Sequence, residues 1–142
     1  MEGNNTLNSK GQVRNRDFAT QHRDYSKLRY GNITPTDLDG LIEYRGTKYV
    51  LIETKFVGDR QILSLDELFS YGQLLALERL CDDLQSRKET ILVVTGHSCT
   101  TKLDIDMAET NVLWFRKKRV WKRPEQPITL KKIVDDFLLN NH

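Results

Sequence analysis

The chain has 142 residues, of which 38% are hydrophobic and 30% are charged, so it is long enough for one ordinary domain but not for two. Its formal net charge of +2 is too small to indicate nucleic-acid binding by itself, and no stretch approaches the unbroken apolar length that crosses a membrane. We therefore expect one globular domain without a membrane segment.

The N-terminal stretch, MEGNNTLNSKGQ, is polar and lacks the apolar core of a secretory signal. We predict a disordered tail over residues 1–12 and a single domain over residues 13–142. Cys81 and Cys99 do not have the spacing of metal ligands, which favours reduced thiols in the cytoplasm over a disulfide framework.

The first half of the chain predicts a short helix followed by a β-hairpin. Residues 13–30 are rich in charged and aromatic side chains, and we assign the short helix there. LDGLIEY alternates between apolar and polar residues, which predicts a strand over 38–44. KYVLIETKF is rich in β-branched and aromatic residues, which predicts a second, antiparallel strand over 48–56. We expect this pair to form the centre of the sheet.

The second half predicts two further helices and two further strands. Ser64 and Glu67 have the spacing of a reciprocal N-terminal cap, and a periodic apolar run after them predicts one long helix over 65–86. Compact apolar runs predict strands over 91–95 and 111–117, and LKKIVDDFLL predicts a C-terminal helix. This order predicts an α/β fold with a mixed central sheet of four to five strands flanked by helices.

Charged side chains occupy the second predicted strand where apolar ones would be expected. Glu53 and Lys55 are two residues apart, so their side chains point to the same face, and burying such a pair is costly unless it is compensated. If the hairpin brings Asp39 beside Glu53, the two carboxylates repel, and a divalent cation is the simplest way to hold both ionised. The alternative is that Glu53 and Lys55 lie on the solvated face of an edge strand and that Asp39 is a turn residue.

The length of the hairpin loop determines whether Asp39 shares a face with Glu53. A three-residue loop at 45–47 places Asp39 on the same face as Glu53, whereas a two-residue turn at 46–47 aims Asp39 away. A bulge near Gly40 would also restore the shared face.

An aspartate at a strand start, a β-hairpin and Glu-x-Lys late in the next strand resemble the PD-(D/E)XK nuclease superfamily, which has a restriction-endonuclease-like fold and includes phage exonucleases and Holliday-junction resolvases. The resemblance covers roughly residues 13–117. It implies that Asp39 and Glu53 bind Mg²⁺, with Mn²⁺ as a substitute, and that Lys55 orients or activates the attacking water. Because the chain reads Pro-Thr-Asp-Leu-Asp before the first strand, Asp37 is the alternative ligand, and we favour Asp39 because it directly abuts the apolar strand.

Other positions match the superfamily less closely. Gln73 in SYGQLL resembles the glutamine that many members carry on the helix after the Glu-x-Lys strand. Asp17 and Asp24 are loose candidates for an acidic residue that members often add from the first helix. The resemblance also implies a homodimer, while the short chain favours nonspecific or structure-selective cutting, or a partner protein that confers specificity.

The chemistry of phosphodiester hydrolysis agrees with these residues. The reaction needs an activated water and a counter-charge for the transition state, and Mg²⁺ held by two carboxylates with a nearby lysine supplies both. We therefore predict a Mg²⁺-dependent DNA nuclease that acts as an endonuclease or exonuclease, and RNA stays open as a substrate. The alternative is a non-catalytic protein that keeps the fold and binds nucleic acid or a partner.

A basic segment, RKKRVWKR at 116–123, is the other candidate for contact with nucleic acid. Arg116, Lys118 and Lys122, with Trp121 as an aromatic platform, could follow a phosphate backbone, or the segment could be an edge strand that lysines protect from aggregation. Arg29 is similarly placed ahead of the predicted hairpin. His97, which precedes Ser98 and Cys99, superficially suggests nucleophilic catalysis, but no partner carboxylate follows at a recognisable spacing, so we predict a loop histidine.

Overall fold

The computed structural model describes residues 24–60, 63–100 and 104–140, and these fall into two parts, residues 24–35 and residues 36–140. The predicted tail over 1–12, Asp17 and most of the predicted first helix lie outside the described residues. Within 24–30 the chain forms a turn instead of a helix, because the carboxylate of Asp24 accepts a hydrogen bond from the backbone N–H of Ser26 at 2.9 Å. Arg29 is exposed in this first part, and its Nε donates to the carbonyl of Gly31.

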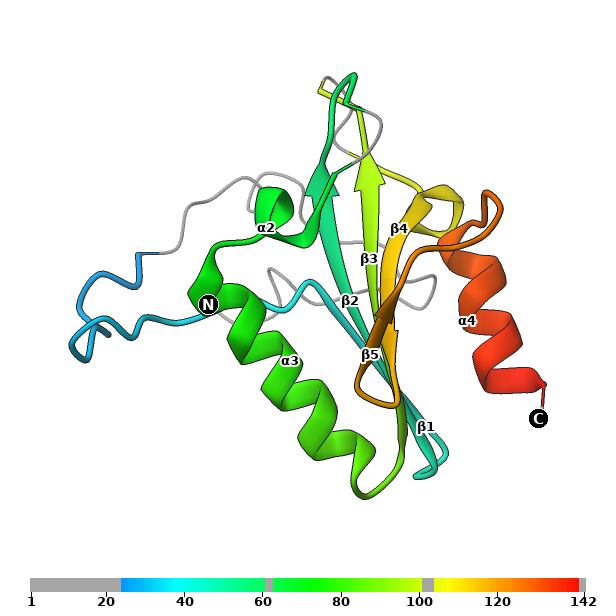
Figure 1. The fold of residues 1–142 in the computed structure, drawn as a ribbon, viewed down its shortest axis with the longest axis horizontal. Helices are drawn as coiled ribbons and strands as arrows, with labels where there is room; N and C mark the ends of the chain where they lie inside the picture. The colour runs from blue at the N-terminus through cyan, green and yellow to red at the C-terminus, as the bar shows by residue number, and fades with distance from the viewer. Residues whose placement is uncertain (1–23, 61–62, 101–103, 141–142) are drawn as a thin grey trace. The chain divides into compact units, whose positions relative to one another are not determined.

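The second part is built on one mixed five-stranded sheet, which confirms the predicted α/β class (Figure 1). The strands are β1 (Gly40–Tyr44), β2 (Lys48–Phe56), β3 (Glu89–His97), β4 (Asn111–Lys117) and β5 (Val120–Lys122), and they lie in the order β1-β2-β3-β4-β5. β2 and β3 are parallel, and the other neighbours are antiparallel. The predicted hairpin strands therefore exist, but β1 lies at the sheet edge and not at its centre, because the helical connection after β2 returns the chain to the other side of β2.

The predicted long helix over 65–86 is wrong, because two helices occupy this stretch. α2 (Leu65–Leu68) begins at the predicted cap, in which Ser64 and Glu67 exchange hydrogen bonds between side chain and backbone. Phe69 is extended, and Ser70 then caps α3 (Tyr71–Gln85) by accepting from the backbone N–H of Gln73. The break places the side chains of Phe69 and Gln73 on the sheet.

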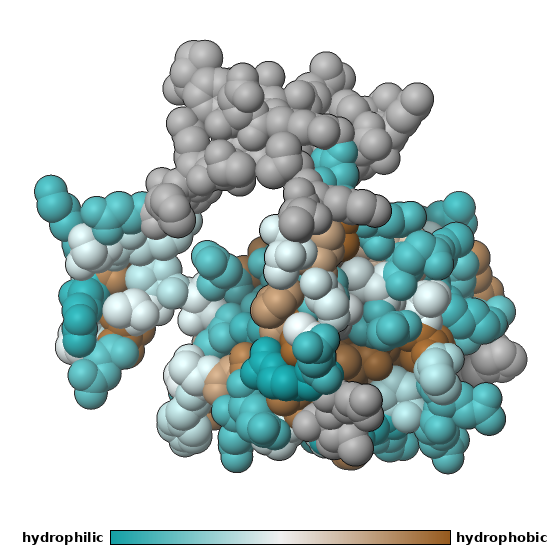
Figure 2. All heavy atoms as spheres, turned by 90° about the horizontal axis from the view of Figure 1, so that it is seen from above, coloured by the Kyte–Doolittle hydropathy of each residue, from teal (hydrophilic) through white to brown (hydrophobic). Residues whose placement is uncertain are grey.

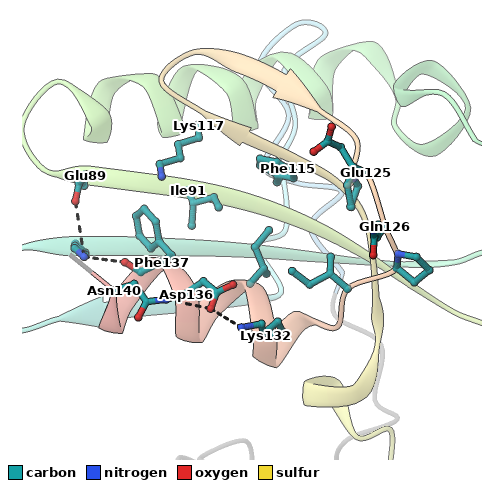
Figure 3. Close-up of a pocket in the computed structure, with 15 residues that line it drawn as sticks. Glu89, Ile91, Phe115, Lys117, Glu125, Gln126, Lys132, Asp136, Phe137 and Asn140 are labelled. Atoms are coloured by element: carbon teal, nitrogen blue, oxygen red, sulfur yellow. Dashed lines mark hydrogen bonds and ion pairs between the residues drawn. The ribbon is translucent and has the colours of Figure 1, made fainter. Parts of the chain in front are cut away.

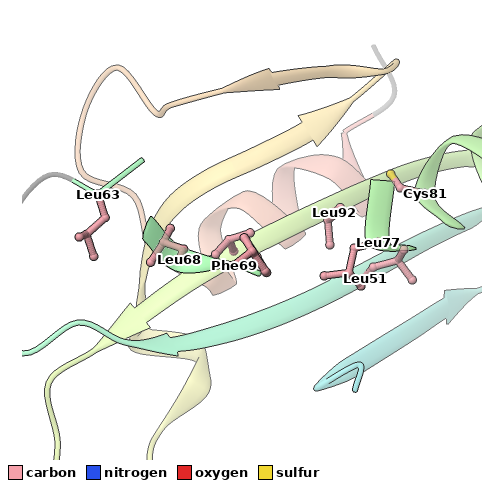
Figure 4. Close-up of a cluster of buried hydrophobic side chains, with 8 residues drawn as sticks. Leu51, Leu63, Leu68, Phe69, Leu77, Cys81 and Leu92 are labelled. Atoms are coloured by element: carbon pink, nitrogen blue, oxygen red, sulfur yellow. The ribbon is translucent and has the colours of Figure 1, made fainter. Parts of the chain in front are cut away.

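Two apolar layers hold the helices to the two faces of the sheet. On one face, β2 and β3 pack against α2 and α3 through a cluster that includes Leu51, Leu92 and Leu77 (Figure 4). On the other face, Val50 and Val93 pack against α4 (Leu130–Leu139), the predicted C-terminal helix, which Thr129 caps. Because side chains alternate along each strand, the odd-numbered residues of β2 face α3 and the even-numbered ones face α4.

The remaining elements complete the layer around β3 and β4. A 3₁₀ helix, η1 (Met107–Glu109), precedes β4 and contacts α4.

Figure 2 shows a face of the molecule on which hydrophilic side chains predominate and hydrophobic ones appear between them. Among the described residues, no helix combines the length and the apolar character that crossing a membrane requires.

Candidate active site

The β1–β2 hairpin sets the position of Asp39. Its loop consists of Arg45, Gly46 and Thr47, since Tyr44 pairs with Lys48, and this is the three-residue loop that the shared face requires. Arg45 and Gly46 have φ values of 53° and 70°, which a left-handed turn needs. The register pairs Gly40 with Ile52, and one further step sets Asp39 opposite Glu53.

Asp39 is held in this place by the backbone of β2. Its Oδ2 accepts a hydrogen bond from the N–H of Thr54 at 2.8 Å. The side chain remains exposed, so the carboxylate is open to solvent while its position is fixed. Asp37 lies two residues before Asp39 and is also exposed. The register of the hairpin sets Asp39, not Asp37, opposite Glu53.

Glu53 is a buried carboxylate on an interior strand. Only 3% of the residue is exposed, and β2 is paired on both sides, by β1 and by β3. The alternative of a solvated edge strand is therefore wrong. Glu53 Oε2 accepts from Nε2 of Gln73 at 3.0 Å, whereas Oε1 is buried and has no hydrogen-bond partner in the part of the chain that the structure describes.

Lys55 and Gln73 complete the constellation from two different elements. Lys55 Nζ lies 3.4 Å from Glu53 Oε2 and donates to Oε1 of Gln73 at 3.1 Å. The Gln73 amide thus joins the two charged groups, because its N–H donates to the Glu53 carboxylate and its oxygen accepts from the Lys55 ammonium. Lys55 Nζ also lies 4.5 Å from the ring centre of Phe69, a distance typical of a cation–π contact.

Phe69 is a site residue that the sequence analysis missed. It reaches Lys55 because α2 ends at Leu68 and α3 begins three residues later, at Tyr71. The sequence signal for this break is Ser70 followed by Gln73, a second cap-like spacing inside the periodic run, with Gly72 between them.

The electrostatics of Glu53 indicate that Lys55 compensates its charge only in part. Burial raises the pKa of Glu53 above its ordinary value, and repulsion from the Asp39 carboxylate raises it further, while the charge of Lys55 lowers it. A cation at Oε1 would relieve both unfavourable effects. The donor set also fits Mg²⁺, which prefers oxygen ligands and uses only one or two protein carboxylates. Over residues 24–60, 63–100 and 104–140, no group of three or more His, Cys, Asp or Glu side chains gathers to hold a metal, so the fit depends on this pair.

The predicted nucleic-acid-binding residues of the segment 116–123 do not all lie on one face of the sheet. Arg116 faces α3 and forms two hydrogen bonds, at 3.0 and 2.8 Å, with the carboxylate of Asp82. Trp121 donates to Glu78 and stacks under the Arg116 guanidinium, so it is part of the packing and not an open platform. Lys118 lies in the β4–β5 turn, and Lys122, which pairs with Phe115, points to the opposite face of the sheet.

The remaining candidates lie apart from the carboxylate pair. His97 is the last residue of β3, not a loop residue, and its ring packs edge-to-face on Phe56 at 5.7 Å. Ser98 donates to the carbonyl of Gly58, so neither side chain forms part of a catalytic triad among the described residues. Burial raises the pKa of the Cys81 thiol to about 11, which makes it unreactive at neutral pH.

Comparison of the chain with protein-family models, with curated proteins and with solved structures gives no match.

Proposed function

We propose that this chain is a Mg²⁺-dependent DNA nuclease whose active site consists of Asp39, Glu53, Lys55 and Gln73. The observation that carries the proposal is the buried Glu53 carboxylate. One of its oxygens is bound to Gln73, the other has no partner among the described residues, and a second carboxylate, that of Asp39, lies opposite it. Strand residues that serve only the core do not require such an arrangement, because a well-packed apolar side chain would be at least as stable.

Each residue has a separate role in the proposed reaction. Asp39 and Glu53 would hold the cation. When bound, Mg²⁺ supplies Lewis-acid activation of water and counter-charge for the phosphoryl oxygens. The Lys55 ammonium stabilises negative charge that develops on the phosphate and orients the attacking water. Gln73 fixes the distance between Glu53 and Lys55, since its amide is bound to both.

Exposed lysines of the β4–β5 hairpin are the residues that we propose to contact nucleic acid. Lys118 and Lys122 are basic and exposed, and phosphate contacts by such side chains supply the sequence-independent part of DNA affinity. Arg116 forms ion pairs with Glu78 and Asp82 of α3, so we assign it a structural role and not a contact with phosphate.

The test is a pair of measurements on the purified full chain. Cleavage is followed on labelled single-stranded, duplex and four-way-junction DNA and on RNA, with Mg²⁺, Mn²⁺ or EDTA. Mn²⁺ binding is followed by calorimetry for wild type, Asp39→Asn and Asp37→Asn, which are matched variants two residues apart. We expect metal-dependent cutting of DNA, and loss of Mn²⁺ binding in Asp39→Asn only.

Two results would contradict the proposal. A folded protein that binds no Mn²⁺ would favour the non-catalytic reading, in which the charged cluster serves binding alone. Equal Mn²⁺ affinity in both aspartate variants would remove Asp39 from the site.

A further inference from the structure

The face of the sheet that carries α4 has a groove that the proposed nuclease site does not use. α4 packs over β3 and against η1, and the sheet beside it, toward β4 and β5, forms one wall of a groove of about 760 Å³ (Figure 3). This volume lies in the range of small-molecule binding sites. Phe115 pairs with Val93, which faces α4, whereas Glu53 and Lys55 face α3, so the groove and the candidate active site lie on opposite faces.

The floor of the groove is apolar. Ile91 and Phe115 come from the sheet, Ile133 and Phe137 come from α4, and Ile128 comes from the segment that leads into α4. These side chains would bind an aliphatic or aromatic group, but offer no hydrogen bond to a base edge or to a phosphate.

Two ammonium groups converge at one end of this floor. Lys48 Nζ and Lys117 Nζ each lie 5.4 Å from the ring centre of Phe137. Lys48 is already engaged, because it donates to the carbonyl of Phe137 at 2.7 Å and lies 3.8 Å from Glu89. Lys117 has no carboxylate within ion-pair distance among the described residues, so its charge is available to a ligand.

Lys132 also lines the groove but, unlike Lys117, it is paired with a carboxylate. Lys132 lies 2.9 Å from Asp136, which neutralises it. A separate, smaller hollow of about 370 Å³ shares Phe115 and Lys117 with the groove and is also lined by Lys118, Val120 and Lys122. The β4–β5 end is therefore cationic over an apolar floor, which is complementary to an anion that carries an apolar group.

We propose that this groove binds a free amphipathic carboxylate, with the carboxylate at Lys117 and its hydrocarbon body on Phe115, Ile133 and Phe137. The apolar floor favours this class over nucleic acid, whose charged backbone would leave the floor uncovered. The proposal uses none of the residues Asp39, Glu53, Lys55 and Gln73, although the cationic hollow beside the groove includes Lys118 and Lys122, to which the proposed function assigns contact with DNA.

Decanoate, kept well below its micelle concentration, is the probe. Its binding to the full chain is followed by the amide resonances of Phe115, Ile133 and Phe137, with decanol as the uncharged analogue. We expect decanoate to shift these resonances and to bind about tenfold more weakly to Lys117→Ala, since one charge-assisted contact is lost. Lys131→Ala removes an exposed lysine of α4 that does not line the groove, and we expect this variant to keep the wild-type affinity.

Several results would overturn the proposal. These are the absence of shifts at the three residues, equal affinity for decanoate and decanol, and unchanged affinity in Lys117→Ala. A short oligothymidylate that displaces decanoate and shifts the same resonances would identify the surface as one for nucleic acid.

Discussion

Replacing Glu53 by glutamine should stabilise the metal-free protein, although it removes an ion pair. The carboxylate is 3% exposed and one of its oxygens lacks a partner in the described structure, and leaving such a group unsatisfied costs about 1–3 kcal/mol. The ion pair with Lys55, at 3.4 Å, offsets only part of this cost, because taking a largely buried pair of charges out of water can cost more than their mutual attraction returns. We expect Glu53→Gln to gain about 1 kcal/mol in EDTA, or about 4 °C in melting temperature.

The pH dependence of this gain has a defined sign. The pKa of Glu53 is raised in the folded state by burial and by Asp39, so its favourable contribution is complete below the ordinary value of 4.5 and is lost as pH rises through the higher folded value. The difference between Glu53→Gln and wild type should therefore shrink when the pH is lowered from 7 toward 4.5.

Metal should reverse the order of stability. A cation present at 100 times its dissociation constant stabilises the protein that binds it by about 2.7 kcal/mol, which only wild type would gain. The assay is thermal unfolding in EDTA and in Mg²⁺, with Glu109→Gln as an exposed control. The reasoning would be refuted if Glu53→Gln melted below wild type in EDTA, or if Mg²⁺ stabilised both proteins equally.

Four further substitutions test the surroundings of the site and the fold that supports it. Arg116→Ala should lower the free energy of unfolding in urea by about 2–3 kcal/mol, because it leaves partly buried carboxylates of α3 without their partner. Lys118→Ala should change the free energy of unfolding by less than about 0.5 kcal/mol. It should also weaken DNA binding and make that binding less dependent on salt concentration. Gly96→Ala should cost about 1–3 kcal/mol, since its Cβ would lie 2.9 Å from Leu113 Cδ1, and a melting temperature equal to that of wild type would contradict this. Ser70→Ala should lose about 1 kcal/mol by removing the cap of α3, as measured by urea unfolding, and an unchanged midpoint would show that the cap is unimportant.

The hairpin strands were predictable from the sequence because local rules determine them, whereas the register stayed open between a two-residue and a three-residue loop until the structure paired Tyr44 with Lys48. The apolar runs fix which residues of β1 and β2 face a core, and Gly46 supplies the left-handed residue that a three-residue loop needs. Asp39 then comes to lie opposite Glu53 without reference to the rest of the fold.

The break between α2 and α3 could not be read from periodicity alone. Leu68 and Phe69 precede Leu75 and Ala76 by seven residues, so apolar side chains keep a helical spacing in the sequence across the break. Only the tertiary position of Phe69, packed in the core beside Lys55, explains why the chain is extended there.

The basic segment shows the limit of counting charges. Its composition predicts a surface for phosphate, but the register of β4 turns Arg116 toward α3 and leaves Lys117 on the opposite face. The acidic partners on α3 are 34 or more residues away in sequence, so the sequence pattern around Arg116 does not indicate them.

The most direct test of the central claim is the single-turnover rate of phosphodiester cleavage in Mg²⁺ by wild type, Lys55→Ala and Lys131→Ala. If Lys55 stabilises the transition state, its removal lowers the rate about 10²–10³-fold in protein that remains folded at the assay temperature, and Lys131→Ala cuts at the wild-type rate. A Lys55→Ala variant that cuts as fast as wild type would contradict the assignment of this site.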